Sequence, residues 1–498
     1  MIRKTTVEGG VVVGIPAADP RITAFKGIPF AAPPVGENRW RAPQPVIPWE
    51  GERKCWTFAP ISMQHIPGLD KDNIYSREWN VDPEIPMDED CLYLNVWTPA
   101  KSKDEKLPVF VWFFGGGLRE GNPAEMEFDG ERLARRGIVV VTVNYRLNVF
   151  GFLSHPELEA QQPDAPTNFG HLDQRAGIIW AKNNIAAFGG DPDNITIGGQ
   201  SAGGGSTCAQ MGSPLNKGLF QKAIIMSGMM TGVYGGRAGI TYEEAKEQGV
   251  KFFEYLGVKN LEEARKIDAV TLRDKCEAFN GRFSTVVDNK FIDGHFVDKM
   301  VKGDHWKMPI IIGNTSTEFR TPLAGDNMAE FTENAKKALG PQADKFLKGA
   351  GDDFEKAKEK SAVCGFELSF RAMKENDRDS GNDYPTYYYV FDPEIPGWDN
   401  PGTFHSSDLW FFFETLAKCW RPFKGKHYDL SRQMCNYWAN FMKTGDPNGN
   451  DADGTPMETW KPYTADESNA MWFGDKPHLE CNKPSEMFEA IVENFKAR

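Results

Sequence analysis

The sequence predicts an α/β protein built on a large, mostly parallel central sheet with helices on both faces. Two apolar runs, residues 107–114 and 138–143, are strand-sized and are separated by a charged stretch of helical character. Such continuous runs are typical of parallel strands that are buried on both faces and joined by a crossover. A third run, residues 195–198, breaks into glycine and continues into small residues. This pattern indicates a strand, a sharp turn and the start of a helix.

The other elements follow in chain order. Two β-rich runs around Gly9 and Gly10 predict an antiparallel hairpin over residues 5–15, at a sheet edge. Residues 25–45 hold too many prolines for a helix or a central strand, so we expect an extended segment wrapped over the core. A helix is predicted over residues 173–188. Further strands are predicted at residues 91–97, 223–226, 309–312 and 387–391.

Two polar stretches rich in Lys and Glu, residues 241–280 and 327–379, predict helical insertions that cover the strand ends. No repeat, low-complexity run or linker divides the chain. We therefore expect residues 1–498 to form a single domain with helical excursions.

Net charge narrows the classes of partner. The chain has 57 Lys and Arg against 70 Asp and Glu, a formal charge of −13, which argues against nucleic acid or an anionic membrane surface. Its longest apolar runs are far shorter than the ~20 residues that span a bilayer. No apolar stretch follows the basic residues at the N-terminus, so we expect no signal peptide and a cytoplasmic protein.

The eight cysteines stand singly, without a Cys-x-x-Cys pair or a Cys/His cluster of zinc spacing. This distribution predicts neither a metal site nor a redox pair. We expect free thiols, most of them buried.

The turn after residues 195–198 reads Gly199-Gln200-Ser201-Ala202-Gly203. Gly-x-Ser-x-Gly between a strand and a helix is the pattern of a nucleophile elbow, in which a strained serine is exposed while the glycines let two backbones pass closely. A bulkier residue at either glycine should clash. Ser201 is therefore the candidate nucleophile.

A serine hydroxyl needs a histidine to accept its proton and an acid to orient that histidine. Where a nucleophile elbow carries the serine, the acid and then the histidine follow it along the chain. Of the histidines late enough, His427 and His478 lie among charged residues and are interpreted as surface groups, whereas His405 precedes an aromatic helix and is the candidate base. Glu318, just beyond the strand at 309–312, is the candidate acid because α/β sheets place sites at strand ends. Asp293 and Asp408 remain alternatives.

Gly115-Gly116-Gly117 follows a buried strand directly. Without Cβ atoms this loop can approach a substrate closely. The backbone amides of Gly116, Gly117 and Ala202 could then stabilise a negative charge on a carbonyl oxygen, as an oxyanion hole does. No Lys-Ser/Thr follows the glycines, so the loop is not a phosphate-binding Walker motif.

With these residues in place, the chain resembles the type-B carboxylesterase family, which includes the cholinesterases, and looks like a bacterial-type member. The resemblance spans nearly the whole length and implies the α/β-hydrolase fold, with a deep gorge over the serine. By resemblance, Ser201, Glu318 and His405 match the catalytic triad, and Gly116, Gly117 and Ala202 the oxyanion hole. The matching segments are FKGIPFAAPP (25–34), EDCLYLNVW (89–97), NYRLNVFGF (144–152), NFGHLDQ (168–174), FGGDP (188–192) and the elbow.

The sequence departs from the family pattern at three places. Phe114 stands where His or Tyr is usual, which predicts an apolar wall, and Gln200 stands where Glu is usual, which removes a negative charge beside the histidine. Secreted members pair the cysteine matching Cys91 with one in the stretch that reads Ile-Ser-Met-Gln (61–64) here. That disulfide is therefore not expected. The expected substrate pocket comprises Phe114, Leu118, Trp79, Gln200 and Met229.

The resemblance also implies two buried ion pairs, Glu89 with Arg146 and Arg39 with Asp173. These pairs would tie the N-terminal segment to the core.

The predicted function is hydrolysis of neutral, apolar or aryl carboxylic esters through an acyl-enzyme, without metal or organic cofactor. The expected partner is a small-molecule ester. Trp79 is similar to the aromatic residue that contacts quaternary ammonium in cholinesterases. It lies in a loop of different length, and Gln200 withholds a supporting charge, so choline esters are a minor hypothesis. A catalytically inactive adhesion protein of the same fold, or an amidase or thioesterase with the same triad, are the alternatives.

Overall fold

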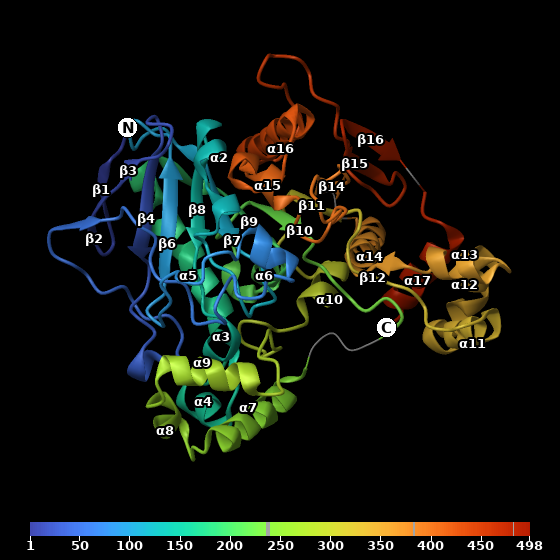
Figure 1. Cartoon of the computed structure of the whole chain (residues 1–498), viewed down its shortest axis with the longest axis horizontal. Helices are drawn as coiled ribbons and strands as arrows, with labels where there is room; N and C mark the ends of the chain where they lie inside the picture. Colours follow the sequence, from blue (N-terminus) through green and yellow to red (C-terminus); the bar gives the residue numbers. More distant parts are fainter. Residues whose placement is uncertain (236–239, 382–383, 482) are drawn as a thin grey trace.

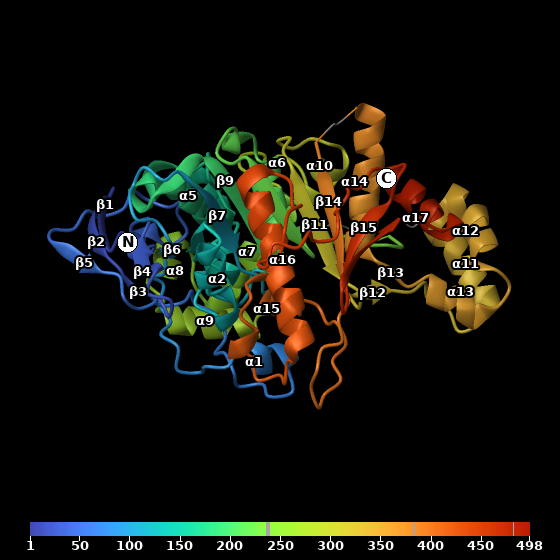
Figure 2. The same cartoon turned by 90° about the horizontal axis from the view of Figure 1, so that it is seen from above.

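A computed structural model describes residues 1–235, 240–381, 384–481 and 483–498. Its centre is a twisted sheet in the order β16-β15-β14-β11-β10-β9-β7-β8-β6-β4-β3 (Figures 1 and 2). Strands β15 through β8 in this order run parallel, whereas both ends of the sheet are antiparallel. The strands are β3 (Ile15–Pro16), β4 (Thr23–Pro29), β6 (Tyr93–Thr98), β7 (Leu107–Phe113), β8 (Val139–Val143), β9 (Gly190–Gln200), β10 (Lys222–Met226), β11 (Ile310–Thr315), β14 (Thr386–Phe391), β15 (Asn469–Phe473) and β16 (Pro477–Cys481).

Helices cover both faces of the sheet, as the sequence predicts (Figure 2). One face carries α2 (Glu131–Arg135), α15 (Leu409–Phe412) and α16 (Gly425–Thr444). The other carries α5 (Phe169–Asn184), α6 (Ala202–Gly212), α10 (Phe296–Val301) and α14 (Gly365–Ser380).

Strand β7 shows why a parallel sheet needs apolar residues in succession. Val109, Val111 and Phe113 belong to one core cluster, while Phe110 and Trp112 belong to the cluster on the opposite face, and all are fully buried. Successive side chains of a strand point to opposite faces, so a strand covered on both sides has no polar position. The continuous apolar run in the sequence has this cause.

The first insertion folds into α7 (Tyr242–Leu256), α8 (Leu261–Arg265) and α9 (Ala269–Ala278), which lie near α3 (Asn148–Phe152) and α4 (Pro156–Gln161) (Figure 1). A capping box starts α7, in which Thr241 and Glu244 each accept a hydrogen bond from the other's amide. The helix ends at Gly257, whose φ of 74° is left-handed.

Most of the second insertion lies beyond the sheet. Helices α11 (Met328–Leu339), α12 (Ala343–Ala350) and α13 (Phe354–Lys360) pack with the C-terminal α17 (Glu486–Lys496) at one side of the molecule (Figures 1 and 2). Helix α14 returns to the sheet. The expectation that the insertions cover the strand ends therefore describes the first insertion better than the second.

The N-terminal region differs from its sequence expectation in two ways. The hairpin of β1 (Lys4–Val7) and β2 (Gly10–Val13) forms, but it pairs with β5 (Glu52–Lys54) in a separate sheet. Residues 25–29 are not a wrapped segment but belong to β4, between β6 and β3. Proline is tolerated there because Pro29 ends the strand. A second small sheet pairs β12 (Arg320–Thr321) with β13 (Val363–Cys364).

The two buried ion pairs exist with their partners exchanged. Nε of Arg39 lies 2.6 Å from Glu89, and Nη2 of Arg146 lies 2.7 Å from Asp173. The backbone amide of Arg146 also donates to Asp173, at 3.0 Å. This bond requires the carboxylate of Asp173, on α5, to lie next to the backbone of residue 146. Arg39 also donates to Ile267, so its pair ties the N-terminal segment to the first insertion.

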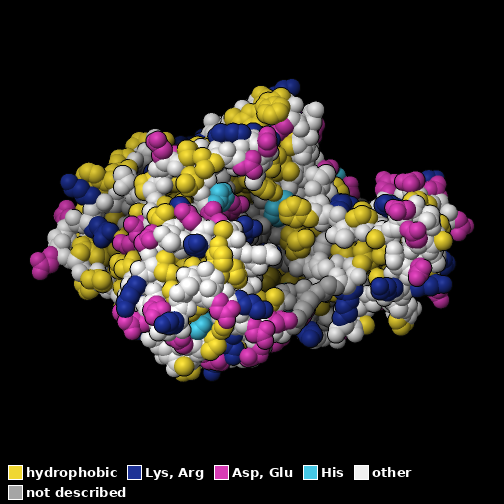
Figure 3. Space-filling view, turned by 60° about the horizontal axis from the view of Figure 1, so that its bottom comes forward, with side chains coloured by type: hydrophobic (Ala, Val, Ile, Leu, Met, Phe, Trp, Pro, Cys, Tyr) yellow, Lys and Arg dark blue, Asp and Glu magenta, His cyan; other side chains and the backbone are white. Residues whose placement is uncertain are grey.

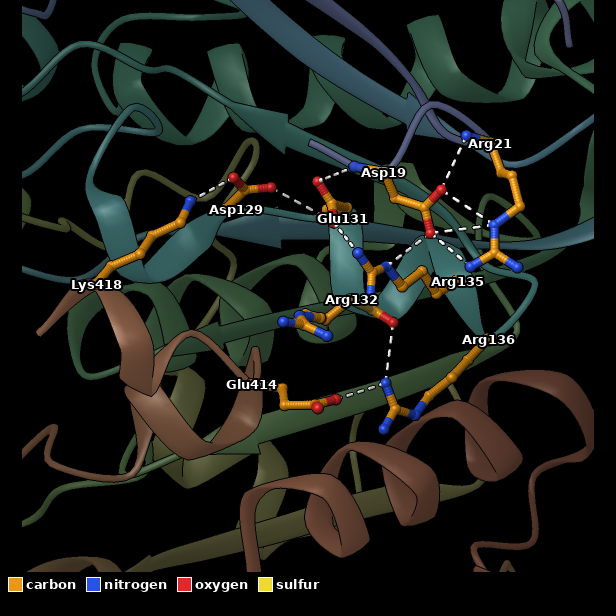
Figure 4. A network of polar contacts seen from close by, with 9 residues as sticks. All are labelled: Asp19, Arg21, Asp129, Glu131, Arg132, Arg135, Arg136, Glu414 and Lys418. Atoms are coloured by element: carbon orange, nitrogen blue, oxygen red, sulfur yellow. Dashed lines mark hydrogen bonds and ion pairs between the residues drawn. The ribbon is translucent and has the colours of Figure 1, made fainter. Parts of the chain in front are cut away.

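Ion pairs also anchor the chain that follows α15 to the region of α2 (Figure 4). Glu414 pairs with Arg136 at 2.7 Å, and Lys418 pairs with Asp129. Figure 4 shows the adjoining contacts of Asp19, Arg21, Glu131 and Arg135. The segment between β14 and α16 is thereby fixed against the sheet.

In the described ranges, no helix combines the length and the apolar character that a membrane span requires. The eight cysteines are all unbridged. Ser62 contacts the thiol of Cys91 and lies in the stretch 61–64, where the family resemblance would place a second cysteine. Burial raises the pKa of Cys91 to about 12.

Thiol titration should therefore find eight free cysteines in protein unfolded without reductant. Buried thiols react only once the chain is open, so the folded protein should react at fewer sites. Two or more thiols missing from the unfolded sample would demonstrate a bridge and contradict the structure.

Candidate active site

Ser201 lies at the sharp turn between β9 and α6. Its φ of 56° and ψ of −122° are strained for a residue with a side chain. A Cβ at Gly199 would lie 2.2 Å from the carbonyl oxygen of Gly203, and one at Gly203 would lie 2.0 Å from that of Phe113. Only glycine fits at both positions, as the sequence pattern predicts.

Glu318 and His405 meet across two loops. Glu318 follows β11, and its Oε2 lies 2.7 Å from Nδ1 of His405, on the loop between β14 and α15. Its other oxygen accepts from the Ser227 hydroxyl and from the Thr315 amide, the latter at 3.2 Å. Burial opposes ionisation of Glu318, but His405 and these donors outweigh it and lower the carboxyl's pKa. Glu318 is thus an ionised carboxylate that accepts from Nδ1–H.

The other two candidate acids bind elsewhere. Asp408 accepts from the Tyr389 hydroxyl at 2.8 Å, and burial raises its pKa to about 7. Asp293 pairs with Lys299. Of the three carboxyl groups, only that of Glu318 contacts His405.

The two other histidines that follow Glu318 in the sequence, His427 and His478, also have partners outside the site. His427 is buried, not at the surface as expected, and its ring nitrogens bond the backbone of Lys424 and Glu394. His478 is exposed and pairs with Glu480.

The raised pKa of Asp408 predicts a pH dependence of stability. The folded protein holds this proton more tightly than the unfolded chain, so Asp408 makes folding less favourable as the pH rises from about 4 to about 7. Asp408→Asn keeps an acceptor for Tyr389 but cannot ionise. In urea unfolding at pH 5 and pH 8, the variant should gain stability relative to wild type at the higher pH. An equal difference at both values would contradict the raised pKa.

Aromatic rings fix the ring of His405. Phe319 lies 4.7 Å away between ring centroids, and Phe366, on α14, stacks nearly parallel at 6.0 Å. The Tyr75 hydroxyl donates to the carbonyl of residue 405 at 3.3 Å. Phe366 is the contribution of the second insertion to the site.

The glycine loop after β7 is shaped to present amides. Gly116 and Gly117 have φ of 103° and 65°, and the carbonyl of Gly116 accepts from Arg119, which closes the turn. A Cβ at Gly117 would meet nothing within 4 Å, so this residue borders open space. Ala202 is the first residue of α6. Among the described residues, the amides of Gly116, Gly117 and Ala202 have no acceptor.

A sequence model of the carboxylesterase family matches residues 2–489. The chain belongs to the carboxylesterase family. Para-nitrobenzyl esterase of Bacillus subtilis (strain 168) is 31% identical over 507 residues, covering 97% of this chain and 96% of that protein. A medium-chain fatty acyl-CoA hydrolase precursor of Anas platyrhynchos is 32% identical over 515 residues, covering 92% and 86%. A solved PNB esterase superposes with a TM-score of 0.80 at 29% identity, covering 99% of both chains.

This carboxylesterase is accordingly a carboxylic-ester hydrolase with the α/β-hydrolase fold. Its residues Ser201, His405, Gly116 and Gly117 line a common pocket of about 910 Å³. Figure 3 shows the face on the side of the first insertion. This face has a hollow that is bordered by hydrophobic and histidine side chains. Four of the six residues expected in the triad and the oxyanion hole thus line one cavity, while Glu318 lies behind His405 and Ala202 follows Ser201.

Two of the five residues expected in the substrate pocket line it. Trp79 and Gln200 line the pocket, whereas Phe114, Leu118 and Met229 do not. The ring of Phe114 is fully buried and stacks on Tyr145 at 4.2 Å. Phe113 belongs to the core cluster on one face of the sheet, and Phe114, the next residue, belongs to the cluster on the other face. The carbonyl of Leu118 instead accepts from Asn148, and Met229 is fully buried.

Several lining residues come from segments that sequence reasoning did not connect with the site. Most lie near residues 73–80, 119–125 and 273–283, on the short helix α1 (Ile74–Glu78), on the end of α9 and on the adjoining loops, where the sequence pattern does not indicate which residues face the pocket. They include Tyr75, Arg119, Glu125, Arg273, Phe279 and Phe283.

Proposed function

We propose that this carboxylesterase is a serine esterase that works through an acyl-enzyme, with Ser201 as nucleophile, His405 as base and Glu318 as orienting acid. The observation that carries the proposal is the 2.7 Å contact between Glu318 and His405 on the wall of the pocket that Ser201 also lines. An ionised carboxylate on Nδ1–H directs the lone pair of Nε2 outward, which is the arrangement a base requires.

In the first half-reaction, Nε2 of His405 takes the hydroxyl proton while Ser201 Oγ bonds to the ester carbonyl carbon. Negative charge then develops on the carbonyl oxygen, where the amides of Gly116, Gly117 and Ala202 donate to it. His405 returns the proton to the alcohol oxygen as the C–O bond breaks, which leaves the acyl group on Ser201. In the second half-reaction, His405 takes a proton from water as the water oxygen bonds to the acyl carbon. His405 then returns this proton to Oγ of Ser201 as the acyl bond breaks and the carboxylic acid leaves.

The pocket lining supports neutral esters with an apolar or aryl group. The rings of Trp79 and Tyr75 lie in a tilted contact along one wall, 5.6 Å between centroids, and Phe319 lies beside His405. Charged groups of both signs line the remainder, so neither sign predominates. They are Arg119, Arg273 and Arg282 against Glu120, Glu125 and Glu277.

A panel of p-nitrophenyl, aryl cinnamoyl and choline esters tests this function. We expect p-nitrophenyl and aryl esters to have at least tenfold higher kcat/KM than choline esters. Rapid mixing with a p-nitrophenyl ester should release a burst equal to the enzyme concentration, with the acyl group on Ser201 in the peptide mass spectrum. Choline esters as the best substrates would contradict the specificity, and acyl transfer without modification of Ser201 would contradict the mechanism.

A further inference from the structure

Gln200, the last residue of β9, reaches the nitrogen of His405 that the proposed nucleophile needs. Its Nε2 lies 3.3 Å from Nε2 of His405, and the side chain is only 2% exposed. The hydroxyl of Ser201, the next residue, makes no hydrogen bond within the part of the chain that the structure describes. The amide of Gln200, and not the hydroxyl of Ser201, therefore holds this nitrogen.

The protonation state and tautomer of the His405 ring decide which group donates in the contact between Gln200 and His405. Nδ1 carries a proton because it donates to the ionised carboxylate of Glu318. In the neutral ring Nε2 is then an acceptor, and the Gln200 amide donates to it. The other end of the carboxamide faces the glycine loop, since a Cβ at Gly115 would lie 2.9 Å from Gln200 Oε1.

The ring of His405 has little freedom to escape this contact. The rings of Phe319 and Phe366 lie beside it, with centroids 4.7 and 6.0 Å from its own, and Glu318 holds Nδ1. Ser201 and Gln200 are adjacent in sequence, so both approach Nε2 from the same elbow. One lone pair cannot serve two donors at full strength.

We propose that Gln200 restrains the reaction by competing with Ser201 for Nε2 of His405. The inference rests on the proposed function. The Gln200 bond exists only while His405 is neutral, because in both transition states Nε2 carries the transferred proton and has no lone pair to offer. An interaction made in the ground state and lost in the transition state lowers the rate. Gln200 is thus a positioning residue that slows the base, whichever half-reaction is rate-limiting.

Gln200→Leu tests the restraint, because leucine has a similar volume and no donor. We expect kcat for a p-nitrophenyl ester to rise about 2- to 10-fold, the range for one neutral hydrogen bond, with KM within twofold. The rate of Ser201 sulfonylation by phenylmethylsulfonyl fluoride should rise in parallel. Thr196→Val on the same strand is the matched control, since its buried hydroxyl has no partner among the described residues. Its kcat should equal that of wild type.

A folded Gln200→Leu protein whose kcat and sulfonylation rate are unchanged or lower would overturn the restraint. If that variant does not fold, Gln200→Met gives the same comparison with an unbranched side chain. Failure of the proposed function looks different, because wild type itself would then neither hydrolyse the ester nor be labelled at Ser201.

Discussion

Ser201→Ala should lower kcat for ester hydrolysis by about 10⁴- to 10⁶-fold while the protein remains folded. The hydroxyl is the group that forms the covalent bond in the proposed reaction, and neither Gln200 nor the amides of the glycine loop can replace it. His405→Ala should have an effect of the same size because, among the residues that the structure describes, no other imidazole contacts Glu318. Circular dichroism and a p-nitrophenyl ester assay, with active-site titration to exclude traces of wild type, measure both variants.

Ser102→Ala, which removes an exposed serine far along the chain from the elbow, controls for preparation and should have wild-type activity. Glu318→Gln separates orientation from nucleophilicity: an amide cannot hold the Nδ1–H tautomer, so a loss of about 10⁴-fold is expected. Activity within tenfold of wild type in a folded Ser201→Ala protein would eliminate the proposed mechanism.

Arg146→Ala should reduce the free energy of unfolding by roughly 3–5 kcal/mol. The variant would leave Asp173, which is fully buried, without the guanidinium that now lies 2.7 Å away. An unpaired buried carboxylate is unfavourable because the low-dielectric interior cannot replace its hydration. Urea unfolding followed by fluorescence measures the change, with the slope of the transition checking that both proteins unfold cooperatively.

The double variant Arg146→Met with Asp173→Leu is the informative control. Replacing both charges by apolar groups removes the unpaired carboxylate, so most of the lost stability should return. Lys4→Ala, which breaks an exposed pair with Glu52, should change stability little. A folded Arg146→Ala protein as stable as wild type would show that the pair with Asp173 does not hold the loop after β8 to α5.

Short-range patterns in the sequence predict the strands and the elbow well. The apolar run of β7 and the Gly-x-Ser-x-Gly turn depend on steric and burial requirements within a few residues. Glu318 was predictable for a similar reason, since the end of a parallel strand limits where its loop can lie. His405 required only chain order and a following aromatic helix.

Partners and orientations that depend on packing were not predictable. Arg39, Glu89 and Arg146 line one small cavity, so the sequence places the charges in one region but does not decide which pairs form. Phe114 was assigned to the pocket although the strand's alternation turns it toward Tyr145. The contact of Gln200 with His405 depends on how β9 and the loop after β14 meet, which no local pattern records.

The order of strands along the sheet has a consequence for biosynthesis. From β10 the chain adds β11, β14 and β15 successively at one edge of the sheet, and each of the first two additions brings one proposed partner of Ser201. Residues 107–226 contain β7, β9, β10 and α6, which support the nucleophile elbow directly, so this part of the sheet is synthesised well before His405. Domains fold cooperatively and long-range pairings form late, so a nascent chain that stops short of the β14–α15 loop has an elbow with no base. The contact between Glu318 and His405 can therefore form only once β14 has joined β11 in the sheet.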